Sequence, residues 1–387
     1  MIPENIRITD YEVLGKLPDL FTFADGSKVR TQADWKLRRK ELISTACELQ
    51  YGIMPPQPEF VEITPLYIRS FGKRFSYRVT TGTREHPVNF IMYVYTPETP
   101  GKYPVVIDGD SCWWYKPENA SIPQMFTDKD IYFVLFDRTE IVPDMQGVPF
   151  KQDNQRNCEI HKAFPEKNFS DIAAWAWGYS RTLDAMIQLG FADEEHVIFT
   201  GLSRGGKAAL LAGALDERAW LVNPEAPCAG GSCYRLKVSA ITQDGEEQRS
   251  EQLEDILQNF PRWFTNDMQT YIGRVEELPF DEHFLKALIA PRIYFDSEAA
   301  SDLWASPVGA YMTNIAAAEA FKFLGVPENM NWYYRDGYHD QNTEDFGMLL
   351  NLIENRLHGT PLSERFGNIP FEKPDPIFEW RAPTVLS

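Results

Sequence analysis

Short apolar runs bounded by turn-forming residues recur through the middle of the chain. Two of them, 103–109 and 131–137, are apolar over most of their length, which is typical of strands buried on both faces of a parallel sheet. A third, 196–200, runs into a glycine and is followed by an alanine- and leucine-rich helical pattern through Leu215. Further runs of these kinds predict strands at 75–80, 89–95, 220–225, 291–297 and 331–334 and helices at 171–190, 310–324 and 344–358. The alternation of strand and helix predicts an α/β fold, a mostly parallel central sheet flanked by helices in a three-layer sandwich.

The segments around these elements follow other patterns. Residues 1–60 contain a charged helical stretch that ends at prolines, and we expect them to form a lead-in arm packed on the core. Residues 61–387 are expected to form the main domain, whose first two strands alternate with a period of two and should pair antiparallel. Two insertions are expected in it, a polar loop or lid at about 138–168 and a charged, aromatic helical segment at about 241–280.

The junction between the third apolar run and its helix carries the clearest chemical motif. Gly201-Leu202-Ser203-Arg204-Gly205 fits G-x-S-x-G, the nucleophile elbow of α/β-hydrolases. The serine of an elbow lies on a strained strand-to-helix turn, so its neighbours must be small. The free N–H groups of the helix start then lie beside the hydroxyl, where an oxyanion develops. Ser203 is therefore predicted to be a nucleophile, and the alternative is an ordinary turn with an N-capping serine.

A serine nucleophile requires a histidine base and an acid that orients it, and in this fold class they follow in the order serine, acid, histidine. His339 lies in the loop after the last predicted strand, where the fold presents its base. Glu298 and Asp302 lie on the loop expected after the preceding strand, the usual place of the acid. Glu225, at the end of the strand after the elbow helix, is a third candidate acid, or else a substrate-binding residue. The residues alone leave the three carboxylates open.

Cations and aromatic rings near these positions are candidates for substrate binding. Arg204 and Lys207 lie on the first helical turn after the serine, where cations oppose the helix dipole. We favour stabilisation of the oxyanion or recognition of an anionic substrate over a solvated surface location. Trp113 and Trp114 lie in the loop expected to supply the second oxyanion donor, and stacking on a sugar and packing in a lid are equal alternatives for them. Trp304 is a further aromatic candidate for binding carbohydrate.

Composition narrows the class of protein. The 387 residues allow one large domain with elaborations or two modest ones, and a net charge of −18 argues against nucleic acid or anionic membranes as partners. Five cysteines without a C-x-x-C pair predict reduced, mostly buried thiols and neither a disulfide framework nor a zinc site. No membrane span or signal peptide is visible. The sequence as it stands therefore favours the cytoplasm, and secretion or a periplasmic location if a leader has been removed.

Several motifs together resemble one family. Gly201–Lys207 is similar to the G-C-S-R-x-G-K signature of glucuronoyl esterases, carbohydrate esterase family 15. Residues 174–178 resemble its A-W-A-W-G helix, and Gly230-Gly231 with 233–235 its G-G…C-[WY]-R loop. Residues 278–281 with 288–292 resemble the segment before its penultimate strand. The lead-in is similar to that of bacterial proteins labelled acetylxylan esterase-like. The resemblance implies an α/β-hydrolase that cleaves glucuronic acid esters in plant cell walls without a metal or organic cofactor.

The resemblance also assigns roles and shows departures. It implies that Ser203 is the nucleophile, His339 the base, Arg204 an oxyanion contributor and Lys207 a contact to sugar hydroxyls. Leu202 replaces the family's cysteine before the nucleophile, and Ala226 stands at the position of its usual glutamate. The sequence thus resembles a branch whose acid has moved to the loop after the penultimate strand, with Asp302 and Glu298 as candidates.

The expected activity is that of a serine carboxylesterase acting on a carbohydrate ester, first of all a glucuronoyl ester. An acetylxylan esterase or a pectin methylesterase is the alternative within enzymes. A catalytically inactive hydrolase fold that binds carbohydrate through its tryptophans is the alternative outside them. The oligomeric state does not follow from the sequence.

Overall fold

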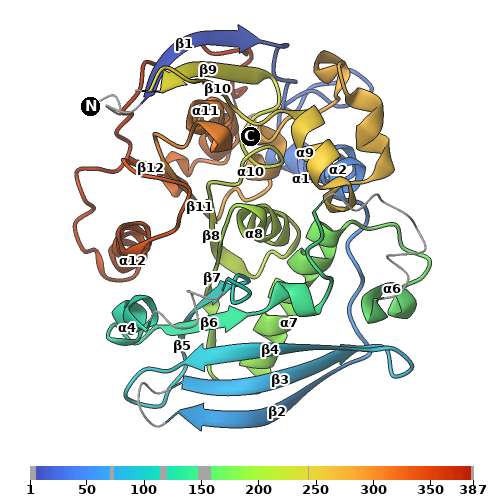
Figure 1. Cartoon of the computed structure of the whole chain (residues 1–387), viewed down its shortest axis with the longest axis vertical. Coiled ribbons are helices and arrows are strands. Elements are labelled where there is room, and N and C mark those ends of the chain that lie inside the picture. The colour runs from blue at the N-terminus through green and yellow to red at the C-terminus, as the bar shows by residue number, and fades with distance from the viewer. Residues whose placement is uncertain (1–5, 70–73, 114–119, 147–157, 243, 385–387) are drawn as a thin grey trace.

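The computed structural model describes residues 6–69, 74–113, 120–146, 158–242 and 244–384 (Figure 1). Its central feature is a nine-stranded sheet with the order β12-β11-β8-β7-β5-β6-β4-β3-β2. The six strands from β12 to β6 are parallel, and β4, β3 and β2 continue the sheet antiparallel. The bounds of these strands are β2 Phe60–Arg69, β3 Arg74–Gly82, β4 Pro87–Tyr95, β5 Tyr103–Asp108, β6 Tyr132–Phe136, β7 Ala192–Leu202, β8 Ala219–Glu225, β11 Ile293–Ala299 and β12 Met330–Arg335.

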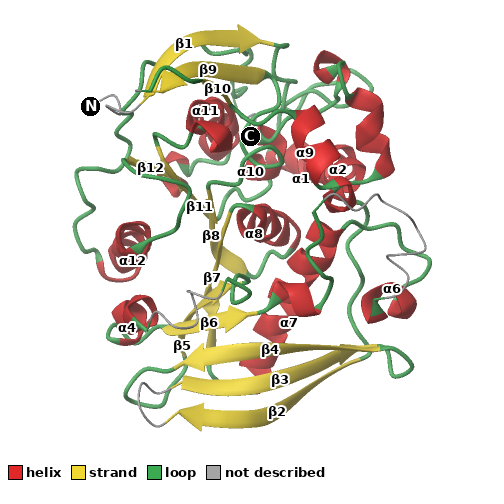
Figure 2. Cartoon of the chain, in the orientation of Figure 1, coloured by secondary structure: helices red, strands yellow, loops and turns green. Residues whose placement is uncertain are grey.

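Helices cover both faces of the parallel part of the sheet, as Figure 2 shows. One face packs on α4 (Ser121–Thr127) and α12 (Thr343–His358) through an apolar cluster that includes Phe133 and Phe346. The other face packs on α7 (Asp171–Gln188), α8 (Arg204–Leu215), α10 (His283–Ala287) and α11 (Pro307–Phe323). Strands β5, β6 and β7 are buried on both faces, which explains their nearly continuous apolar sequence.

A second, smaller sheet lies at the opposite end of the molecule from β2–β4 (Figure 1). It consists of β1 (Ile6–Val13), β9 (Leu236–Thr242) and β10 (Glu247–Arg249), paired antiparallel. The predicted helical insertion at 241–280 is therefore only partly right, because its first residues belong to strands. Pairing of β9 with a strand more than 200 residues away leaves no local signal in the sequence. The remainder holds α9 (Leu253–Asn259) and short 3-10 turns at Pro261–Trp263, Asn266–Tyr271 and Val275–Glu277.

The N-terminal segment packs closely on the core. Helix α1 (Gln32–Leu42) continues as a π-helical stretch (Ile43–Glu48) into α2 (Leu49–Tyr51), and Trp35 and Leu42 are buried in the main apolar cluster. The Tyr51 hydroxyl donates to the carbonyl of Gly230 at 2.6 Å. The remaining short elements are α6 (Glu159–Ala163) and 3-10 turns at Arg138–Glu140, Leu303–Ala305 and Pro327–Asn329. The division into an arm and a main domain stays a prediction.

The strands and helices predicted from the sequence lie where they were expected, with ends that differ by a few residues. One difference bears on the site. Strand β11 extends to Ala299, so Glu298 lies within the strand and not on the loop after it. No helix among the described residues is both long enough and apolar enough to cross a bilayer.

Candidate active site

Ser203 occupies a sharp turn between β7 and α8. Its backbone angles are φ 59° and ψ −117°, a conformation that non-glycine residues rarely adopt. The glycines on either side permit this turn: a Cβ on Gly201 would lie 2.6 Å from the carbonyl oxygen of Gly205, and one on Gly205 would lie 2.2 Å from Oδ1 of Asp110. The Ser203 N–H donates to the carbonyl of Glu225 at 2.8 Å. The strained turn is the local geometry of a nucleophile elbow.

Asp110 supports the elbow from the loop after β5. Its Oδ2 accepts the N–H of Leu202 at 2.7 Å, and its Oδ1 lies 3.2 Å from Nη1 of the buried Arg138. A carboxylate thus fixes the backbone directly before the nucleophile. The sequence analysis missed Asp110, although it singled out the loop that carries it.

His339 and Asp302 meet at the carboxyl ends of two neighbouring parallel strands. His339 follows β12, Asp302 follows β11, and Nδ1 of the histidine lies 2.5 Å from Oδ2 of the aspartate. Asp302 is almost fully buried, and its Oδ1 accepts the N–H of Ala305 at 3.4 Å. This second contact holds the carboxylate in one orientation. A carboxylate on Nδ1 orients the ring so that Nε2 remains for a proton transfer.

The other two candidate acids lie elsewhere. Glu298 is fully buried within β11, and burial, with the negative charges of Asp296 and Asp302, raises the pKa of its carboxyl well above the usual range. Glu225 is also fully buried and accepts a hydrogen bond from the hydroxyl of Ser297. Burial, with the charge of Asp345, likewise raises the pKa of Glu225. The structure brings neither carboxyl into a contact with His339 among the described interactions.

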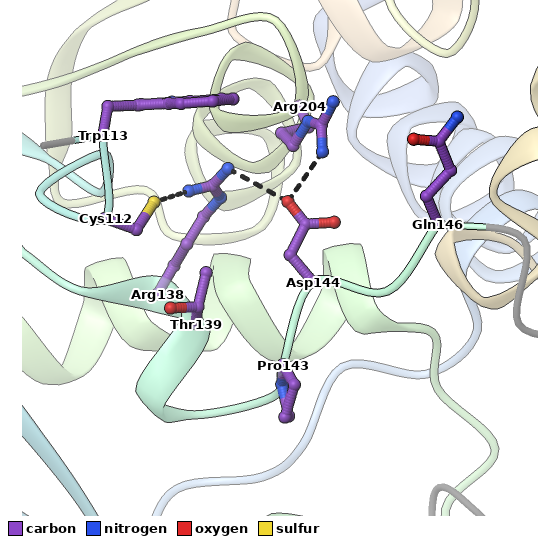
Figure 3. Close-up of a pocket in the computed structure, with 8 residues that line it drawn as sticks. All are labelled: Cys112, Trp113, Arg138, Thr139, Pro143, Asp144, Gln146 and Arg204. Carbon is purple, nitrogen blue, oxygen red and sulfur yellow. Dashed lines mark hydrogen bonds and ion pairs between the residues drawn. The ribbon is translucent and has the colours of Figure 1, made fainter.

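Arg204 lies at the edge of a pocket of about 460 Å³ (Figure 3). Its Nη1 donates to Oδ2 of Asp144 at 2.8 Å, and its guanidinium stacks on the rings of Trp263 at 4.6 Å and Phe260 at 4.9 Å. The predicted Trp113 lies on the same wall, with its ring centre 5.4 Å from the guanidinium carbon. Asp144 and aromatic rings thus hold the cation next to the nucleophile. Trp114 lies outside the described residues, as do 147–157 of the predicted loop.

Lys207 is buried one turn further along α8. Its exposed fraction is 1%, its Nζ lies 5.5 Å from the ring centre of Trp263, and burial lowers the pKa of its ammonium. The charge is attracted by the buried Glu251, which the sequence analysis missed and whose carboxylate also interacts with His339. The Glu251 N–H donates to the carbonyl of Trp304 at 3.1 Å, and the Trp304 side chain is partly exposed. Glu251 thus links the three elements: it attracts Lys207, interacts with His339 and bonds to the backbone of Trp304.

The described residues contain no group of three or more histidine, cysteine and acidic side chains arranged to hold a metal ion. All five cysteines are free, and Cys47, Cys228 and Cys233 are buried.

Comparisons with known proteins place the chain in a family. A family model described as glucuronyl esterase of fungi matches residues 79–325. A 4-O-methyl-glucuronoyl methylesterase of Wolfiporia cocos is 30% identical over 320 residues, which cover 81% of this chain and 73% of that protein.

Solved structures agree with the sequence matches. A family 15 glucuronoyl esterase from Caldicellulosiruptor kristjansonii superposes with a TM-score of 0.80 at 26% identity, covering 96% of this chain and 98% of that one. A serine-to-alanine variant of the Sporotrichum thermophile glucuronoyl esterase, in complex with methyl 4-O-methyl-β-D-glucopyranuronate, superposes with a TM-score of 0.71 at 25% identity, covering 94% of this chain and 92% of that one.

These matches extend over most of the sequence, and the residues matched by the family model include the Ser203 elbow and Asp302. They confirm the family resemblance and the fold class predicted from the sequence, and they place the protein among carboxylic ester hydrolases. The chain belongs to the glucuronoyl esterase family.

Proposed function

We propose that this protein is a serine esterase that hydrolyses glucuronoyl esters of plant cell-wall-type carbohydrates, with Ser203, His339 and Asp302 as its catalytic triad. The observation that carries the proposal is the contact of 2.5 Å between His339 and Asp302 at the sheet edge where the Ser203 elbow also lies. Strands β7, β11 and β12 are parallel, so their carboxyl ends share that edge. The relatives named as glucuronoyl esterases support the substrate.

The proposed reaction proceeds through an acyl-enzyme. The Ser203 hydroxyl attacks the ester carbonyl while His339 Nε2 takes its proton, and Asp302 stabilises the resulting imidazolium. Collapse of the tetrahedral intermediate expels the alcohol, which receives the proton from His339. Water, deprotonated by His339, then attacks the glucuronoyl–serine ester, and glucuronic acid leaves as Ser203 regains its proton.

The oxyanion of both tetrahedral intermediates forms beside the start of α8. We assign its stabilisation to the backbone N–H groups of the first helical turn and to the guanidinium of Arg204. Asp144 and the stacked rings hold that guanidinium in place before the substrate arrives. Such preorganisation stabilises developing charge without a reorganisation cost.

We assign recognition of the sugar ring to the residues around the triad. Lys207 is a buried donor and Glu251 a buried acceptor, an arrangement suited to neighbouring hydroxyl groups. The partly exposed ring of Trp304 offers an apolar face for the sugar, and Trp113 lines the pocket beyond Arg204. Glu225 is buried behind the elbow, where its carbonyl accepts the Ser203 N–H and its carboxyl accepts the Ser297 hydroxyl, so we assign it no role in substrate binding.

The proposal includes partners and compartment. The net charge of −18 supports a protein that binds neither nucleic acid nor anionic membranes. Free, largely buried thiols support a reducing compartment such as the cytoplasm.

The test is a comparison of substrates with the wild type and Ser203→Ala. Benzyl glucuronate, methyl-esterified pectin and acetylated xylan are assayed under identical conditions. We expect turnover of the glucuronate ester that the substitution abolishes. Turnover of acetylated xylan or pectin alone would replace the proposed substrate by one of the two alternatives. Carbohydrate binding without Ser203-dependent hydrolysis of any ester would indicate an inactive binding protein.

A further inference from the structure

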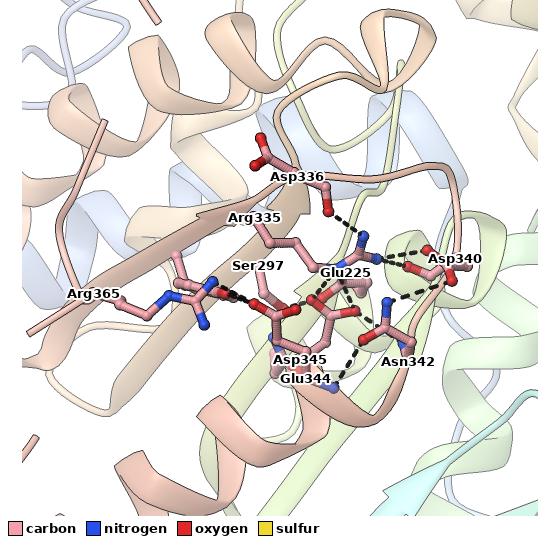
Figure 4. Close-up of polar contacts among 11 residues, drawn as sticks. Glu225, Ser297, Arg335, Asp336, Asp340, Asn342, Glu344, Asp345 and Arg365 are labelled. Atoms are coloured by element: carbon pink, nitrogen blue, oxygen red, sulfur yellow. Dashed lines mark hydrogen bonds and ion pairs between the residues drawn. The ribbon is translucent and has the colours of Figure 1, made fainter. Parts of the chain in front are cut away.

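The last residue of β12, Arg335, makes an unusually complete set of contacts under the histidine loop (Figure 4). Its side chain is buried, and Nε lies 2.7 and 2.9 Å from the two carboxylate oxygens of Asp345 on α12. Nη1 donates to the carbonyl of Asp336 at 3.1 Å. Nη2 donates to both the carbonyl and the carboxylate of Asp340, at 2.5 and 2.7 Å.

These contacts bracket the proposed base. Asp336 and Asp340 stand on either side of the segment Gly337-Tyr338-His339, so one guanidinium binds a carbonyl at each end of it. The segment itself turns tightly, because the Asp340 N–H donates to the carbonyl of Tyr338 at 2.8 Å. His339 is the central residue of that three-residue turn. The position of its ring is therefore determined by what holds the two flanking residues.

The loop is also shaped to admit the guanidinium. Gly337 has a φ of +129°, a region that favours glycine, and a Cβ there would lie 2.4 Å from Nη1 of Arg335. Glycine, which has no Cβ, thus stands at the point where the loop backbone passes the guanidinium of Arg335. This turn therefore depends on a close contact between the loop backbone and the Arg335 side chain.

The backbone of Arg335 reaches the acid loop as well. Its carbonyl accepts the N–H of Ala300 at 2.7 Å, two residues before Asp302. Asp345 in turn accepts the N–H of Asn342 at 2.9 Å, which closes the far end of the histidine loop. Arg335 is thereby the common attachment of the loops that carry Asp302 and His339.

We propose that Arg335, held by Asp345, is a positioning residue that sets the distance between His339 and Asp302. The inference rests on the proposed function, because it assigns the base and the acid as that function does. Arg335 touches neither substrate nor the reacting atoms in this scheme. Its contribution is to fix the loop so that the imidazole is presented to Ser203 in one orientation.

The electrostatic environment of Arg335 keeps its guanidinium charged. Burial by itself lowers the pKa of the Arg335 guanidinium, but the hydrogen bonds and negative charge of Asp345, with further contributions from Glu225 and Asp340, raise it overall. A planar guanidinium supplies five N–H donors in a fixed fork. A lysine ammonium is compact and cannot reach Asp345 and both ends of the loop in the same way.

The test combines substitutions with two readouts. Arg335→Gln, Arg335→Lys and the double variant Arg335→Gln/Asp345→Asn are compared with the wild type. The double variant removes both buried charges and remains informative if the single substitution, which leaves Asp345 unpaired, prevents folding. The first readout is the rate at which a fluorophosphonate labels Ser203, which depends on the serine–histidine pair and not on sugar recognition. The second is kcat and KM on benzyl glucuronate.

We expect the labelling rate and kcat to fall by about 100-fold in Arg335→Gln and in the double variant, with KM unchanged within about threefold. Arg335→Lys should recover part of the loss. The matched control is Arg365→Gln, which removes an exposed arginine. Arg365 pairs with Glu344, the residue next to Asp345 on α12, and stacks on Tyr333. It should label and turn over as the wild type does.

A double variant that folds and labels Ser203 at the wild-type rate would overturn the inference. So would a loss that appears in KM alone, or one that Arg365→Gln reproduces. If the wild type is labelled at Ser203 but does not hydrolyse the glucuronate ester, the proposed substrate fails, and the labelling rates still decide the role of Arg335.

Discussion

Oδ2 of Asp302 lies 2.5 Å from Nδ1 of His339, although 37 residues separate the two along the chain. The register of the sheet explains the encounter. Strands β11 and β12 run parallel with Glu298 opposite Tyr334, so the loops that leave them emerge side by side. The proposed acid is thus delivered by the strand next to the one that delivers the proposed base.

The first prediction concerns that acid. Asp302→Asn removes the charge that stabilises the imidazolium, and we expect kcat on a glucuronate ester to fall by about 10³- to 10⁴-fold. Glu298→Gln and Glu225→Gln are the matched controls. Neither glutamate side chain contacts His339 among the described interactions, so an amide of the same shape should leave kcat within about threefold. Steady-state kinetics on the three variants measure this, and a loss in Glu298→Gln equal to that in Asp302→Asn would refute the assignment of the acid.

Sequence and structure agree where the signal is local. The elbow around Ser203 depends on glycines within five residues, and the buried strands depend on uninterrupted apolar runs, so both could be predicted. The choice among Glu225, Glu298 and Asp302 could not, because a strand that extends to Ala299 turns Glu298 into the core. A difference of a few residues at a strand end decides that case, and strand ends are the least certain part of a sequence-based assignment.

Long-range contacts account for the rest. Asp144 comes to Arg204 from 60 residues away, and Glu251 comes to Lys207 from a segment with no catalytic motif. Pairing of β1 with β9 depends on residues at opposite ends of the first 242 positions. Such contacts form only when the whole chain is folded, so the sequence around each residue does not predict them. The position of the two cations against the helix dipole and the family resemblance both indicated Arg204 and Lys207, but neither indicated the residues that hold them.

Lys207 provides the second prediction. We expect Lys207→Met to raise KM for a glucuronate ester by about 10- to 100-fold while kcat changes little, since a hydrogen bond from a charged group to the sugar serves ground state and transition state alike. Methionine fills the same buried volume but leaves the buried Glu251 carboxyl without the cation that attracts it, so the melting temperature should also fall. Kinetics and thermal unfolding on one preparation measure both. A fall in kcat with KM unchanged would move Lys207 into the chemical step.

The third prediction concerns stability and pH at His283, a buried residue outside the site. Its Nε2 lies 2.8 Å from the carbonyl oxygen of Pro18, and its Nδ1 has no hydrogen-bond partner among the described residues. Burial lowers the pKa of the ring from 6.5 to about 3. Between pH 6.5 and about 3, His283 therefore binds a proton in the unfolded chain but not in the folded one. Stability from this group is complete above pH 6.5 and is lost as the pH falls.

The comparison with His283→Gln isolates that group, because other titrating residues cancel between the two proteins. The unfolding free energy of the wild type should drop relative to the variant by about 1.4 kcal/mol for each pH unit below the unfolded pKa. Denaturant unfolding at several pH values measures the difference. A difference that is independent of pH would show that folding does not lower the pKa of His283.

The fourth prediction contrasts two glycines in helices. Gly205→Ala would place a methyl group against Asp110, breaking the carboxylate's hold on Leu202, and should lower both stability and kcat. Gly347→Ala on α12 meets only the Met125 side chain at 3.7 Å and should raise the unfolding free energy by about 0.5–1 kcal/mol. Denaturant unfolding and kinetics on the pair measure this. A Gly205→Ala variant with normal stability and activity would contradict the tight approach at the elbow.

The central claim is that the glucuronoyl group passes through a covalent ester with Ser203. Mixing the protein with benzyl glucuronate, quenching in acid during turnover, and digesting for peptide mass spectrometry tests it most directly. We predict a mass increase of one glucuronoyl group on the peptide that contains Ser203, and no such increase in Ser203→Ala. The acyl-enzyme should accumulate in Asp302→Asn if that substitution slows deacylation more than acylation. Full turnover with every Ser203 peptide unmodified, or with the sugar on another residue, would contradict the account.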